Sequence, residues 1–125
     1  MLSAPTRLID IGAPGNHGPI TPRLVLSPKG QGDVQYLALS HCWGTASGGR
    51  VPKTTGSTLA ERMAGIAWDE LSKTFQDALV ATKGLGFRYI WIDSLCIIQD
   101  SEEDFQLECA KTGSVYSNAV CTIAV

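Results

Sequence analysis

The chain lacks a concentration of charge of either sign, and it lacks a long apolar run. Its 125 residues carry 10 Lys and Arg against 12 Asp and Glu, a formal net charge of −2. Nucleic-acid binding needs a basic stripe that neutralises phosphates, so we expect no nucleic-acid partner. No segment approaches the ~20 apolar residues that cross a bilayer, and the opening "MLSAPTRLID" lacks the apolar core of a secretory signal. These absences predict a cytoplasmic protein without a membrane span.

The cysteines and histidines lack the spacing of a metal site. The four cysteines, Cys42, Cys96, Cys109 and Cys121, include no CxxC pair, and the 2 histidines do not form a zinc-binding pair. All four cysteines lie in apolar segments, where a free thiol behaves as a small hydrophobic group. We therefore predict reduced core thiols and no metal site, with a disulfide or a metal as the alternative.

Length and composition are those of one ordinary globular domain, with 44% hydrophobic and 18% charged residues. Strands are predicted at 36–40, 88–98 and 119–125, and helices at 58–64, 72–83 and 101–113. Because strands and helices alternate, the pattern predicts parallel crossovers. The strands are almost continuously apolar, which indicates a mostly parallel sheet with helices on both faces.

The two ends of the chain carry further β signals. The runs "TRLIDIG" and "PRLVLSP", separated by a Gly- and Pro-rich stretch, predict a short antiparallel β pair. We assign this pair to an N-terminal extension, 1–35, that precedes the main domain, 36–125. The last residues, "AVCTIAV", form an apolar strand with no turn or cap after it. We therefore expect the domain to be truncated here and to continue past Val125.

Two predicted strands end in unusual polar chemistry. "SHCWG", residues 40–44, follows one strand, and "DSLCIIQD", residues 93–100, lies late in the next. Ligands of open parallel sheets bind beyond the carboxyl ends of the strands, so Asp93 and Trp43 are candidate site residues at one edge. The alternatives stay open: a buried aspartate often accepts backbone N–H bonds, and a tryptophan can anchor a core.

The last predicted helix carries a third candidate, Glu108. At ~100° per residue, an inward stripe of this helix comprises Phe105, Cys109, Thr112 and Tyr116. Glu108 then lies about 60° off that stripe, at its border. A partly buried acid could take a raised pKa and act in acid–base chemistry, whereas an exposed one would only cover apolar surface. Cys96 paired with a distant histidine is a less favoured nucleophile.

Three separated motifs carry a resemblance to a known family. They are "LSHCWG" at Leu39–Gly44, "WIDSLCIIQ" at Trp91–Gln99, and the helix end with Glu108, Tyr116 and Ala119. Together they closely resemble the heterokaryon-incompatibility (HET) domain of filamentous fungi over residues 36–125. "TRLIDIG" is similar to the lead-in of such proteins. Three residues depart from the usual pattern: His41, Phe105 and Thr112.

The resemblance implies a cytoplasmic effector of fungal non-self recognition that triggers programmed cell death through self-association or partner binding. The family is also distantly similar to the TIR domain, which implies a flavodoxin-like fold and, as an alternative, NAD⁺ cleavage without a further cofactor. On that analogy Glu108 and Asp93 are the candidate catalytic acids, although the TIR glutamate follows a later strand. The remaining motif residues become candidates for ligand binding or an interface: Ser40, Trp43, Gly44, Cys96, Gln99 and Tyr116.

Overall fold

The computed structural model describes residues 5–12, 18–27, 35–40 and 53–124. Its strands are β1 Arg7–Asp10, β2 Arg23–Leu26, β3 Tyr36–Ser40, β4 Tyr89–Trp91 and β5 Cys121–Ala124. Its α-helices are α1 Leu59–Ala64, α2 Lys73–Gly84, α3 Asp93–Cys96 and α4 Glu102–Asn118, and a 3₁₀ helix covers Trp68–Glu70.

The five strands form one mixed sheet in the order β2-β1-β4-β3-β5. β3 is parallel to both β4 and β5, whereas β1 is antiparallel to both β2 and β4. The prediction of a mostly parallel, flavodoxin/TIR-like sheet is therefore wrong. The two N-terminal strands are part of the sheet, because β1 pairs Ile9 with Ile90 in its interior. All four residues of β1 are buried, which suits a strand that has a neighbour on each side.

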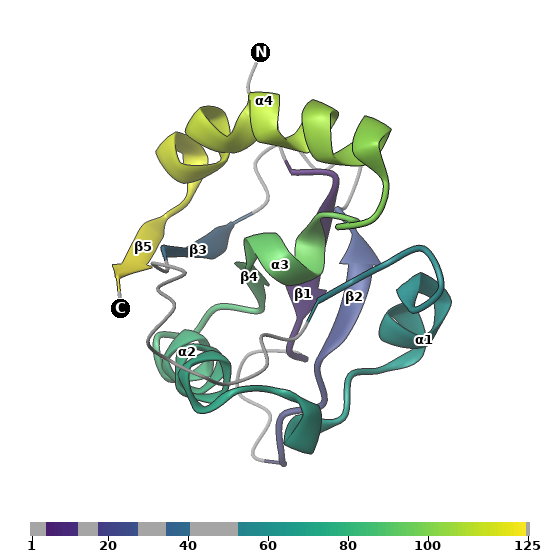
Figure 1. Cartoon of the computed structure of the whole chain (residues 1–125). Coiled ribbons are helices and arrows are strands. Elements are labelled where there is room, and N and C mark those ends of the chain that lie inside the picture. Colours follow the sequence, from purple (N-terminus) through teal and green to yellow (C-terminus); the bar gives the residue numbers. More distant parts are fainter. Residues whose placement is uncertain (1–4, 13–17, 28–34, 41–52, 125) are drawn as a thin grey trace.

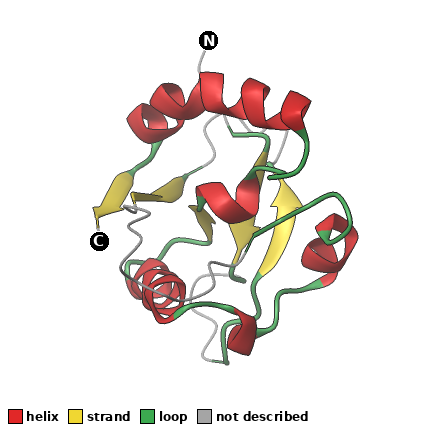
Figure 2. Ribbon diagram, in the orientation of Figure 1, coloured by secondary structure: helices red, strands yellow, loops and turns green. Residues whose placement is uncertain are grey.

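Helices lie on both sides of this sheet. Figure 1 shows α4 across one side and α2 on the other, with α3 near the middle and α1 beside β2. In Figure 2 the strands form one layer between these helices. Large side chains with no more than 1% exposure fill the core between the layers, among them Tyr36, Phe75 and Trp91.

The predicted helix at 72–83 is confirmed by α2. Ser72 caps it by accepting a hydrogen bond from the backbone N–H of Phe75 (3.3 Å). The four residues that the sequence places on its inner side are all buried: Phe75, Ala78, Leu79 and Thr82. Gly86 follows the helix with φ of 87°, a left-handed conformation in which a side chain would be strained.

The predicted strand at 88–98 is mostly wrong, because strand geometry stops at Trp91. The chain then turns into α3, where the N–H groups of Leu95 and Cys96 donate to the carbonyl of Ile92. A short apolar run fits a buried helical turn as well as a buried strand, so hydrophobicity does not separate the two.

The last helix is longer than the predicted 101–113. Ser101 caps α4 by accepting from the N–H of Asp104 (3.2 Å), as the sequence indicates, but α4 passes through Gly113 and ends at Asn118. A glycine inside a helix costs about 1 kcal/mol. Packing offsets this cost: Val115 is buried, and its carbonyl accepts a hydrogen bond from the Tyr36 hydroxyl (2.5 Å).

Candidate functional site

The carboxyl ends of β3 and β4 meet at one edge of the sheet. The two strands are parallel neighbours, and their register pairs Ala38 with Trp91. Ser40, which ends β3, and Asp93, two residues beyond Trp91, therefore share that edge as predicted. Two further residues predicted for this edge lie outside the described part of the chain: Trp43 and Gly44.

The turn that carries Asp93 is held by side chains from two other segments. The amide of Gln99 donates to the carbonyls of Asp93 (3.1 Å) and Ile97 (2.8 Å). The hydroxyl of Thr54 donates to the carbonyl of Leu95 (2.6 Å). Gln99 was predicted for ligand binding or an interface, and in this structure its amide binds two carbonyls of this turn, of which that of Asp93 also accepts from the N–H of Ile97.

Tyr116 joins α4 to the same edge. Its hydroxyl donates to the carbonyl of Leu39 in β3 (3.2 Å). Its ring meets the Trp91 ring edge-on, with centroids 5.5 Å apart and planes at 84°. Burial raises the pKa of Tyr116, and the negative charge of Asp93 raises it further. Tyr116 and Asp93 are therefore electrostatic neighbours, as a shared edge requires.

Cys96 lies inside α3 and is completely buried. Its sulfur accepts a weak hydrogen bond from the Ile92 N–H (3.4 Å). Burial raises the pKa of this thiol to about 12, so it stays protonated at neutral pH. A buried thiol of this kind is inert as a nucleophile. Cys109 and Cys121 are exposed, so the predicted core location is wrong for both; Cys42 is outside the described residues.

The inner face of α4 differs from the predicted stripe. Phe105 is 43% exposed and Cys109 is exposed, whereas Glu108 is only 2% exposed. The buried face of α4 is rotated relative to the predicted one because α4 packs on polar groups of β1 and of Thr6, the residue that precedes β1. Glu108 accepts hydrogen bonds from the N–H (3.3 Å) and the hydroxyl (2.8 Å) of Thr6.

Asp104, one turn earlier in α4, forms a second contact with β1. Its carboxylate accepts from the guanidinium of Arg7 (2.5 Å) and from the N–H of Ile98 (2.9 Å). Arg7 also donates through Nε to the carbonyl of Cys96 (3.0 Å). The charged groups under α4 thus connect β1, α3 and α4, and no apolar periodicity marks them in the sequence.

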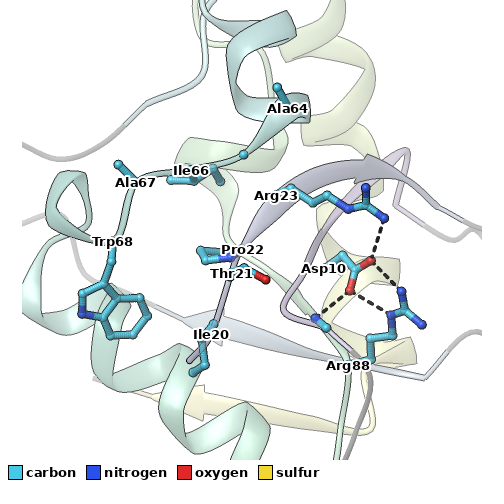
Figure 3. Close-up of a pocket in the computed structure, with 12 residues that line it drawn as sticks. Asp10, Ile20, Thr21, Pro22, Arg23, Ala64, Ile66, Ala67, Trp68 and Arg88 are labelled. Carbon is cyan, nitrogen blue, oxygen red and sulfur yellow. Dashed lines mark hydrogen bonds and ion pairs between the residues drawn. The ribbon is translucent and has the colours of Figure 1, made fainter. Parts of the chain in front are cut away.

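A cavity of about 580 Å³ lies between β1, β2 and the segment 64–68 (Figure 3). Arg23 and Arg88 lie at one end of it, and Trp68 lies at the other. Ile20 and Pro22 lie between them along the wall. The sequence analysis did not single out this cavity, because its walls combine residues from distant segments.

Asp10 organises the charged end of the cavity. Its carboxylate accepts two hydrogen bonds from Arg88, at 2.8 and 3.0 Å, and one from the Gly12 N–H at 2.9 Å. Arg23 reaches the same carboxylate at 3.6 Å. Burial by itself raises the pKa of Asp10, but these hydrogen bonds and the two positive charges outweigh burial and lower it. Asp10 is therefore ionised at neutral pH.

No described helix has both the length and the apolar character that crossing a membrane requires. Within the same part of the chain, no three His, Cys, Asp or Glu side chains are grouped as a metal site would need.

Comparison with models of protein families identifies a match over most of the chain. The model of the family "Heterokaryon incompatibility protein (HET)" matches residues 36–125. The chain belongs to the HET family. It therefore has a role in fungal heterokaryon incompatibility. No curated protein and no solved structure matches it significantly.

Several residues of the motifs that resemble the HET family make structural contacts in the described part of this HET domain. Gln99 stabilises the turn after α3, Tyr116 ties α4 to β3, and Glu108 binds Thr6. Thr6 lies before the matched segment 36–125. The matched segment thus binds the N-terminal strand pair through one of its own motif residues.

We expect Glu108→Ala to lower the free energy of unfolding by about 1–3 kcal/mol, because two donors of Thr6 lose their acceptor inside the protein. Glu108→Gln keeps one acceptor oxygen and should cost less. Glu103→Ala on the exposed side of α4 is the control, with an expected change within about 0.5 kcal/mol. Urea unfolding measures all three. If the alanine variants at 108 and 103 are equally stable, Glu108 has no structural role.

Proposed function

We propose that the chain is the effector module of a cytoplasmic heterokaryon-incompatibility protein, and that it triggers cell death by self-association through β5. HET family membership supports the first part. The observation that carries the second part is the open edge of β5, which among the described residues pairs only with β3.

The composition of this edge favours pairing with another strand. Residues 120–124, "VCTIA", contain no charge and no proline, the residue types with which monomeric proteins protect an edge strand. Val120 is 50% exposed, and Cys121 and Thr122 are exposed as well. The described hydrogen bonds of β5 run to β3 on one side only, and because hydrogen bonding alternates along a strand, every second residue of β5 presents its N–H and C=O groups to the open edge.

A charged residue placed on this edge should separate the copies. We expect Thr122→Lys to convert a concentration-dependent oligomer into a monomer in sedimentation velocity. Leu26→Lys is the matched control, because Leu26 is 55% exposed on β2, the opposite edge strand. In hyphae, expression of the wild type and of Leu26→Lys should kill the cell, and expression of Thr122→Lys should not. A wild type that is monomeric at all concentrations, or a lethal monomeric Thr122→Lys, would contradict the proposal.

A second candidate function is NAD⁺ cleavage at the edge that carries Asp93. The observation in its favour is a pair of buried polar atoms beside Asp93, the indole nitrogen of Trp91 and the hydroxyl of Ser94, which have no hydrogen-bond partner among the described residues. Release of nicotinamide by the wild type, lost in a folded Asp93→Asn variant, would assign this activity. The same assay on Thr122→Lys would reveal whether turnover requires assembly.

A further inference from the structure

The lining of the cavity beside Asp10 carries a net positive charge, even after the ion pairs within it are counted. It contains two guanidinium groups, of Arg23 and Arg88, and a single carboxylate, of Asp10. The carboxylate is 5% exposed, whereas the side chains of Arg23 and Arg88 are 54% and 41% exposed. One positive charge at this end is therefore uncompensated by the lining and accessible to solvent.

The guanidinium groups are also held in place. Arg88 binds Asp10 through Nε and one terminal nitrogen, and its guanidinium carbon lies 5.6 Å from the centroid of the Tyr89 ring. A planar guanidinium fixed on one edge offers its other N–H groups in a geometry that suits carboxylate, sulfonate or phosphate oxygens. Arg23 reaches the same carboxylate from β2, so both groups converge on one point (Figure 3).

Apart from Thr21 and two glycines, the remainder of the lining consists of apolar side chains and ends in an aromatic ring. Ile20, Pro22 and Ile66 line the wall between the arginines and Trp68 (Figure 3). Trp68 is partly exposed and packs against the core. A volume of about 580 Å³ falls within the range of roughly 300–1,000 Å³ that is usual for small-molecule sites.

We propose that this cavity binds a small organic anion, with its acid group at Arg23 and Arg88 and its apolar or aromatic body against Ile66 and Trp68. The site joins residues of the N-terminal strand pair to residues of the matched HET segment. It is separate from the open edge of β5, because β2 and β5 are opposite ends of the sheet. The proposal is therefore independent of the proposed self-association.

The test uses 8-anilinonaphthalene-1-sulfonate, a fluorescent probe with an aromatic body and one acid group, on the whole chain. We expect saturable binding of one probe per chain, with shifts of the Gly12 and Ala67 amide signals and the Trp68 indole signal in ¹H–¹⁵N spectra. Arg23→Ala should weaken binding about tenfold, the loss expected for a charge-assisted hydrogen bond. N-phenyl-1-naphthylamine, which lacks the acid group, should bind the wild type and Arg23→Ala equally.

Lys73→Ala is the control for net charge. It removes one positive charge, as Arg23→Ala does, from a side chain that is 84% exposed and belongs to α2, away from the lining residues. It should leave probe affinity unchanged within about twofold. Trp68→Leu should weaken the probe without changing its salt dependence, and thermal unfolding of every variant excludes binding to a loosened core. Equal weakening by Lys73→Ala and Arg23→Ala, or shifts confined to residues outside the cavity, would overturn the proposal.

Discussion

A fragment limited to residues 36–125, the segment that matches the HET family, should show no cooperative unfolding transition in urea. The full chain should show one. The reason is that β1 lies inside the sheet, between β2 and β4. Leu8, Ile9 and Leu24 of the missing strands are 0% exposed, and at about 1.5–3 kcal/mol for each buried side chain their loss is comparable with the whole stability of a small domain.

The deletion also removes the polar partners of α4. Glu108 loses the two donors of Thr6, and Asp104 loses the guanidinium of Arg7. A pair of substitutions in the full chain separates the loss of buried side chains of the N-terminal strands from the loss of chain length. Ile9→Ala should cost about 2–5 kcal/mol as a buried large-to-small change, while Leu26→Ala, at a 55% exposed position of β2, should cost much less. A fragment that unfolds cooperatively near the midpoint of the full chain would show that 36–125 is an independent domain.

Local features of this chain were predictable because they depend on neighbouring residues. The caps at Ser72 and Ser101 and the buried side of α2 follow from patterns within a few turns of the chain. The parallel pairing of β3 with β4 joins distant residues, but the strand–helix–strand order of the sequence predicts it. The position of β1 was not predictable in this way. Its pairing with β4 joins Ile9 to Ile90, and nothing local to either run specifies the other.

The same distinction applies to the site residues. Asp93 was placed at the correct edge because parallel pairing fixes where β4 ends. The prediction for the inner face of α4 was wrong because it assigned apolar residues to that face. The groups that lie opposite α4 are the donors of Arg7 and Thr6, which pair with the carboxylates of Asp104 and Glu108. The cavity was missed because Asp10 meets Arg23 through β1–β2 pairing and Arg88 through β1–β4 pairing. Once those registers are known, the charge pattern identifies the site.

We expect Arg7→Met to lower the free energy of unfolding by about 3 kcal/mol, the lower end of the range for breaking a buried ion pair, because Asp104 keeps some solvent contact. The side chains of Arg7 and Asp104 are 7% and 16% exposed. Without Arg7 the carboxylate keeps the N–H of Ile98 as a partner but loses its counter-charge, and the carbonyl of Cys96 loses a donor. Asp104→Asn should also destabilise the fold, since it leaves the guanidinium without a counter-charge under α4.

The double variant distinguishes coupling from two independent losses. With Arg7→Met and Asp104→Asn together no unpaired charge remains, so the combined loss should be smaller than the sum of the single losses by at least about 1 kcal/mol. The exposed pair Lys73 and Asp77 provides the comparison cycle, an ammonium–carboxylate pair at 3.0 Å with side chains that are 84% and 62% exposed. Its coupling should be about 0.3–0.5 kcal/mol and should fade in high salt. Equal coupling in both cycles would mean that burial under α4 adds nothing to the Arg7–Asp104 pair, and that the polar face of this helix is held by packing alone.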